Sequence, residues 1–78
     1  MIKFDEAKKK AVEHIDDGLE VIRCTETKDL YVFYFGINKE PVVGIPMVVV
    51  AKKNGELHEV FLPSEEGFEI INTEREIE

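Results

Sequence analysis

The run Leu30-Tyr31-Val32-Phe33-Tyr34-Phe35 is the most strand-like part of the chain, because every residue in it except Leu30 is β-branched or aromatic. Both alternating sets of side chains are apolar, so both faces of this strand favour burial. We therefore expect a central strand over about residues 30–36. Tyr31 and Tyr34 lie on opposite faces of it, and we expect one of them to reach the surface and anchor a partner.

The flanking segments predict three more strands in an antiparallel arrangement. A polar break at residues 27–29 suits a hairpin turn, and residues 36–44 read as a loop. Asn54-Gly55 between two apolar runs is a strong hairpin signal. A loop of two or of three residues remains open there, and with it the face that Phe61 occupies. The four strands are expected at about residues 19–26, 30–36, 45–52 and 56–62.

An amphipathic helix precedes the strands. Apolar residues recur at helical spacing over about residues 4–17, and a helix this short must pack its stripe on the sheet. A short final element is expected at residues 68–71, and residues 72–78 read as a frayed tail. The stripe consists of Phe4, Ala7, Ala11, Val12 and Ile15.

The order of these elements predicts a single α+β domain over residues 1–78. Its N-terminal helix packs on one face of a four-stranded antiparallel sheet, an arrangement like that of the cystatins. Because one helix cannot cover a whole sheet, we expect the other face to be partly exposed or covered by a partner.

The negative charge of the chain is concentrated in its last third. The formal net charge is −7, and residues 56–78 hold eight glutamates against Arg75 alone. Such a surface repels phosphate backbones and anionic membranes and attracts basic proteins, so we expect neither nucleic acid nor membrane as partner. The alternative is that the charge only keeps the protein soluble. The acids expected to contact a partner are Glu56, Glu59, Glu65, Glu66 and Glu69.

The reactive side chains give no sign of an assembled catalytic centre. Cys24 is the only cysteine; it lies in a predicted strand, and a buried structural cysteine is the better interpretation. His14 and His58 read as ordinary surface or boundary residues. The sequence has no metal-binding motif and no phosphate-cradling glycine loop, so we expect no enzyme, no metal and no cofactor.

A single cysteine cannot form an internal disulfide, which fits a reducing compartment. The N-terminus becomes charged at once and has no apolar run of signal-peptide length. We therefore expect the protein in the cytoplasm.

Three segments together resemble the bacterial immunity protein 35 family: residues 31–35, residues 44–50 (Gly-Ile-Pro-Met-Val-Val-Val) and residues 53–57 (Lys-Asn-Gly-Glu-Leu). The resemblance runs from Phe4 to about Leu62. Tyr31 stands where that family often has tryptophan, and Ala51 where an aspartate is common. The resemblance implies a toxin-neutralising protein without catalytic residues.

Three non-catalytic functions stay open at this point; an enzyme is a fourth and would require a pocket that joins Cys24 to a histidine. The first is a non-catalytic interaction module of immunity type that docks an acidic surface on a basic protein. The second is a self-associating structural or regulatory domain that forms a homodimer through the uncovered sheet face. The third is a cystatin-like peptidase inhibitor, whose wedge would have to include the hairpin tip Lys53-Asn54-Gly55.

Overall fold

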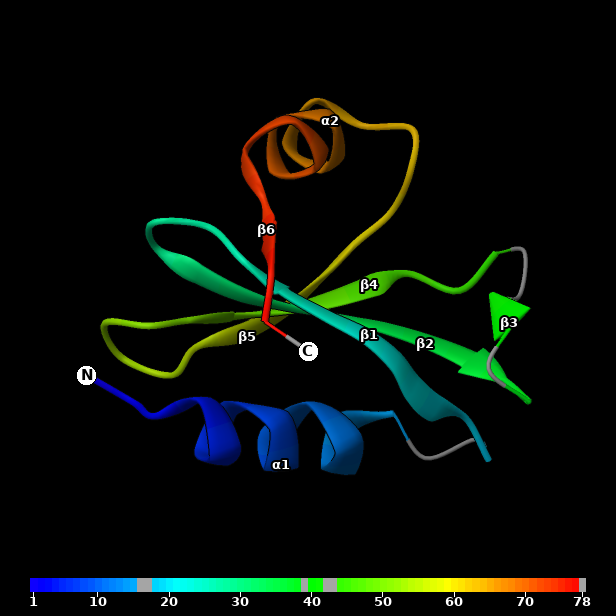
Figure 1. Ribbon diagram of the computed structural model, residues 1–78, viewed down its shortest axis with the longest axis horizontal. Helices are drawn as coiled ribbons and strands as arrows, with labels where there is room; N and C mark the ends of the chain where they lie inside the picture. The colour runs from blue at the N-terminus through cyan, green and yellow to red at the C-terminus, as the bar shows by residue number, and fades with distance from the viewer. Residues whose placement is uncertain (16–17, 39, 42–43, 78) are drawn as a thin grey trace.

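The computed structural model describes residues 1–15, 18–38, 40–41 and 44–77. These residues form an antiparallel sheet that lies between two helices, one on each face (Figure 1). The expected α+β fold, with an N-terminal helix on an antiparallel sheet, is confirmed. The second helix was not expected from the sequence.

The sheet has the strand order β5-β4-β2-β1-β6, and β3 pairs with the end of β2 outside this order. β2 is central as expected, since Tyr31 pairs with Glu26 of β1 on one side and with Val50 of β4 on the other. β3 lies in the segment expected to be a loop, and β6 lies in the segment expected to be a frayed tail. The strands are β1 (Glu20–Glu26), β2 (Leu30–Ile37), β3 (Glu40–Pro41), β4 (Met47–Ala51), β5 (Leu57–Val60) and β6 (Arg75–Glu76).

The expected hairpin at Asn54-Gly55 joins β4 to β5, but its loop is longer than two or three residues. Ala51 N–H donates to the Glu56 carbonyl at 2.8 Å, so the whole of residues 52–55 lies in the loop. Gly55 has a φ of +76°, a left-handed conformation that favours glycine. Phe61 lies beyond the end of β5 and is exposed.

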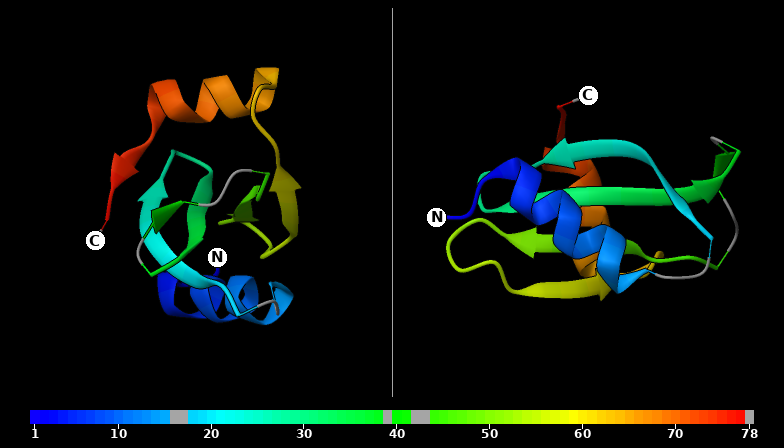
Figure 2. Two further views of the ribbon diagram at one scale, coloured as in Figure 1. Left: turned by 90° about the vertical axis from the view of Figure 1, so that its right-hand side faces the viewer. Right: turned by 90° about the horizontal axis from the view of Figure 1, so that it is seen from below.

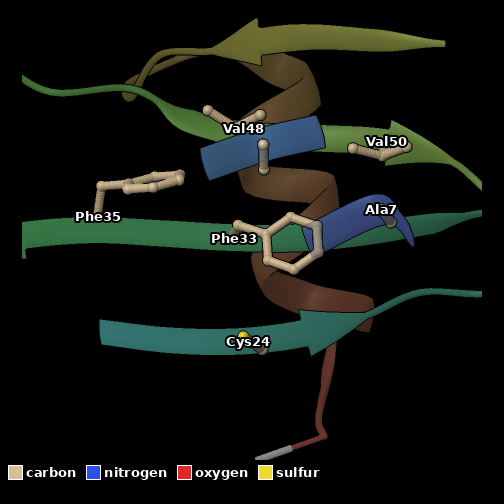
Figure 3. Packing of buried hydrophobic residues seen from close by; sticks show 7 residues of the cluster. Ala7, Cys24, Phe33, Phe35, Val48 and Val50 are labelled. Carbon is tan, nitrogen blue, oxygen red and sulfur yellow. The ribbon is translucent and has the colours of Figure 1, made fainter. Parts of the chain in front are cut away.

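Helix α1 (Phe4–His14) packs closely on one face of the sheet because it presents alanines there. Ala7 and Ala11 are fully buried, whereas Val12 is 46% exposed and lies outside the buried stripe. The helix ends at His14 rather than near residue 17, and residues 16–17 lie outside the described part. Figure 3 shows the side chains that meet this helix, which are Cys24, Phe33, Phe35, Val48 and Val50.

Helix α2 (Glu65–Thr73) covers the opposite face (Figure 2, left). Its Ile70 belongs to a second buried cluster, which sits on the sheet face turned away from α1. The expectation of a partly uncovered sheet face is therefore wrong, and a homodimer through that face stays an untested prediction. The short element expected at residues 68–71 is the middle of this helix. The sheet residues in the cluster are Val32, Met47, Val49 and Val60.

Candidate functional site

The outer face of α2 carries large apolar side chains in contact with solvent. Phe68 is 54% exposed and Ile71 is 42% exposed, and their i,i+3 spacing makes them neighbours on the helix. Phe61 and Leu62, in the segment that leads into α2, are also about half exposed. A Cβ at Gly67 would stand only 2.5 Å from Leu62 Cδ2, so Leu62 packs against the helix at Gly67, one turn before Ile71.

Two acids border this apolar face. Glu65 lies three residues before Phe68 and four residues before Glu69. The two glutamates are therefore about one turn apart along one flank of the helix. Both are exposed, and neither carboxylate has an ion pair within the described residues. We call Phe61, Leu62, Glu65, Phe68, Glu69 and Ile71 together the α2 surface.

The five acids expected at a partner interface do not form one surface. Glu66 lies on α2, but its carboxylate is 2.8 Å from His58 Nε2 of β5. Glu59 is on the opposite side of the sheet, where it lies 2.7 Å from His14 Nε2 of α1. Glu56 is exposed at the end of the β4–β5 loop. Only Glu65, Glu66 and Glu69 therefore belong to α2 and its surroundings.

The two tyrosines face opposite sides of the sheet as expected, and both contact residues of their own chain. The Tyr31 ring lies edge-on to Phe4 at a centroid distance of 5.7 Å, and Lys52 Nζ is 5.0 Å from its centre. The Tyr34 hydroxyl donates to Glu74 on the other face. Their part in binding a partner stays a prediction. Two other aromatic residues, Phe61 and Phe68, are exposed, and neither was expected from the sequence to contact a partner.

Glu74 forms a polar cluster that no pattern in the sequence indicates. Its side chain is only 8% exposed, and Oε1 accepts hydrogen bonds from Thr25 Oγ1 at 2.7 Å and from Tyr34 at 2.5 Å. Arg23 Nη1 lies 3.6 Å from the other oxygen. Burial, together with the hydrogen bond to Glu74 and its charge, raises the pKa of Tyr34 well above its usual range. The cluster fastens the end of α2 to β1 and β2.

Arg23 also holds the strand that follows α2. Its Nε donates to Glu76 of β6 at 2.8 Å, and its guanidinium carbon lies 5.3 Å from the centre of the Tyr34 ring. Burial opposes the charged guanidinium, but the hydrogen bond to Glu76 and the nearby carboxylates outweigh it and raise the pKa of Arg23. Two of the chain's C-terminal glutamates therefore have a structural role.

Cys24 and the two histidines lie in different surroundings. Cys24 is 1% exposed within the cluster under α1, as expected for a structural cysteine. His14 and His58 are exposed, each beside a glutamate, and they lie on opposite sides of the sheet. Within residues 1–15, 18–38, 40–41 and 44–77, no three histidine, cysteine or acidic side chains are grouped so as to hold a metal ion.

The hairpin tip proposed as an inhibitory wedge packs partly against α1. Lys10 Nζ donates to the Gly55 carbonyl at 2.6 Å, and Gly55 is buried. Ile2 N–H donates to the Lys52 carbonyl at 2.9 Å, which fixes the base of the loop. Only Lys53 and Asn54 of the three tip residues are exposed.

Two hollows flank the α2 surface. One, of about 170 Å³, lies beneath Phe61 and Leu62 and reaches Tyr34 on the sheet. The other, of about 380 Å³, lies between α2 and the β1–β2 turn, with Leu30 and Ile70 among its lining residues. Four carboxylates border this second hollow, which makes it strongly negative. They belong to Asp29, Glu65, Glu66 and Glu69.

Comparisons with protein-family models, curated proteins and solved structures found no match. None of the described helices is both long enough and apolar enough to cross a lipid bilayer.

Proposed function

We propose that this protein is a non-catalytic interaction module that binds a basic protein partner through the α2 surface, as a toxin-neutralising immunity protein in the cytoplasm would. The observation that carries the proposal is the exposure of Phe68 and Ile71 on α2 beside two acids that form no ion pair within the described residues, with exposed Leu62 packed on the helix at Gly67. Exposed apolar groups that gather in one place with a polar rim are typical of protein interfaces.

The charge of the chain supports a basic partner. Glu65 and Glu69 are not neutralised within the described residues, and Glu66 and Asp29 add negative charge at the neighbouring hollow. Opposite charge on a partner speeds association through long-range attraction, and the apolar side chains then supply short-range contact. A basic toxin such as a nuclease fits both requirements.

The resemblance to immunity protein 35 supports this proposal, but it does not extend over helix α2. The resembling residues end at about Leu62, and helix α2 begins at Glu65. The resembling part contains α1 and strands β1 to β5, whereas β6 and most of the α2 surface lie beyond it. We therefore expect the choice of partner to depend on α2, with the sheet as its support.

A growth assay with the adjacent gene tests the proposed function. We expect the product of a neighbouring toxin gene to stop growth of a bacterial host, and co-expression of this protein to restore growth. The double variant Phe68→Ser/Ile71→Ser should lose protection, because it removes the apolar contact while leaving the charge unchanged. Val12→Ser is the matched control, since Val12 is an exposed apolar residue on α1. Full protection by the double variant at equal expression would contradict the proposal.

A further inference from the structure

The outer face of α2 can be recognised only through side chains. The backbone groups inside α2 are bonded within the helix, and its first turn is capped by Ser64 Oγ, which accepts from Gly67 N–H at 3.0 Å. The open edge of the sheet at β5 and the short strand β6 lie at the two ends of the strand order, away from this face. A partner therefore cannot bind here by adding a strand to the sheet.

The apolar side chains form a ridge along the helix. Phe68 and Ile71 are spaced i,i+3, and Leu62 widens the ridge where it packs on Gly67. Ridges of this kind fit the grooves between side chains on a second helix. The nine residues of α2 span about 13 Å, which matches two to three turns of a partner helix.

The acids form a row parallel to that ridge. Glu65 and Glu69 are one turn apart and flank Phe68 on one side, so their negative charges repeat at the spacing of a helical turn. Glu66 borders the same hollow as these two acids, but its carboxylate is already bonded to His58 of β5 at 2.8 Å. A complementary helix would carry lysine or arginine one turn apart, next to its apolar stripe.

From this ridge and this row we infer that the partner presents a basic amphipathic α-helix, which lies along α2. Its apolar stripe contacts Phe68, Ile71 and Leu62, and its cationic side chains lie opposite Glu65 and Glu69. This inference rests on the proposed function, because it names the recognition element of the same partner-binding surface.

Titration of the isotope-labelled protein with two peptides, followed by NMR, tests the inference. Both peptides contain only leucine and lysine in equal numbers, with a length of about 18 residues, or five helical turns. One places leucine at helical spacing, and the other alternates leucine with lysine as a strand would. We expect the helical pattern to shift the amide signals of α2 and to bind at least about tenfold more tightly than the alternating one.

Variants of the α2 surface make the test specific. Phe68→Ser/Ile71→Ser should weaken binding of the helical peptide by about tenfold or more, whereas Val12→Ser should leave it unchanged. The charge-reversed variant Glu65→Lys/Glu69→Lys should instead prefer a leucine–glutamate peptide of the same helical pattern. Thermal unfolding of each variant checks that the fold is retained.

The outcomes separate the inference from the proposed function. One outcome overturns the helical partner but keeps the α2 surface as a binding site. In it, both lysine peptides bind with equal affinity and shift the signals of α2, and Phe68→Ser/Ile71→Ser abolishes this binding. The inference and the proposed function are both overturned if the peptides do not bind, if they shift signals outside α2, or if the double variant binds them unchanged.

Discussion

At the scale of single residues, Glu74 shows how one buried carboxylate can hold two parts of the chain together. It is almost fully buried, and a buried carboxylate destabilises a protein unless hydrogen bonds compensate for its lost hydration. Thr25 and Tyr34 supply two hydroxyl donors, and Arg23 supplies a positive charge. The end of α2 therefore depends on side chains that lie about 40–50 positions away in the sequence.

Removal of one hydroxyl tests this cluster. We expect Tyr34→Phe to lower the free energy of unfolding by about 1–2 kcal/mol, because Glu74 loses a hydrogen bond while it stays buried. Tyr31→Phe is the control, since the Tyr31 hydroxyl makes no hydrogen bond within the described residues; it should change stability by less than about 0.5 kcal/mol. Urea unfolding followed by circular dichroism measures both. Equal effects of the two substitutions would contradict this role for Glu74.

The Lys52–Glu26 pair gives a prediction for acidic pH. Lys52 Nζ donates to Glu26 at 2.6 Å, and this hydrogen bond, together with the charge of Lys52, lowers the pKa of Glu26. Because the pKa is lower in the folded state than in the unfolded state, the pair stabilises the fold above the unfolded pKa. This contribution is lost as the pH falls through the folded pKa. NMR titration of the Glu26 carboxyl group should show the lowered pKa, and Lys52→Met should raise it.

At the scale of elements, the four longer strands β1, β2, β4 and β5 could be predicted from the sequence, whereas the two-residue strands β3 and β6 and helix α2 could not. Residues 30–35 are apolar on both faces, and in β2 they have a strand on each side and a helix over each face. α2 has nine residues, a glycine at its third position and only three large apolar side chains. Its local pattern was therefore too weak to distinguish a helix from a short strand.

The sequence does contain a start signal for α2. Ser64 caps the helix, and Glu65 and Glu66 in the first turn interact favourably with the helix dipole. The α2 surface could not be predicted beyond its acids, because the exposure of Phe68 and Ile71 depends on which helical face Ile70 turns to the sheet. The pairing of Glu66 with His58 and of Glu59 with His14 depends likewise on the tertiary fold.

The cap predicts how α2 responds to a single substitution. Ser64→Ala should lower the free energy of unfolding by about 1 kcal/mol, because Gly67 N–H loses its acceptor. Ser64→Asp should keep most of the stability, since aspartate is also a good cap. Hydrogen exchange should show faster exchange in α2 for the alanine variant, with little change in β2. Unchanged exchange in α2 would show that the cap contributes little.

At the scale of the whole molecule, the two helices cover the sheet unequally. α1 buries two alanines against the sheet, whereas α2 buries only Gly67 and Ile70 and keeps Phe68 and Ile71 in solvent. The Glu74 cluster and the pairing of β6 with β1 help to hold α2 in place. α2 therefore covers the sheet, and we propose that it is also the surface offered to a partner.

A chain that ends at Pro63 tests the first of these two roles. Without α2 and β6, the face that contains Val32, Met47 and Val49 loses the cover provided by Ile70. We expect this chain to lose at least about 3 kcal/mol of stability and to self-associate, because contiguous apolar surface then faces water. Its mass by light scattering should rise with concentration, and it should bind an apolar dye.

The full-length variant Phe68→Ser/Ile71→Ser is the control for this truncation, since it keeps Ile70 in place while its outer face becomes polar. It should retain the stability of the unaltered protein and show no rise in mass with concentration. If the truncated chain also kept a constant mass and its stability, the sheet and α1 would fold independently of α2. The helix would then serve partner binding alone, and its attachment through Glu74 would position the α2 surface without supporting the core.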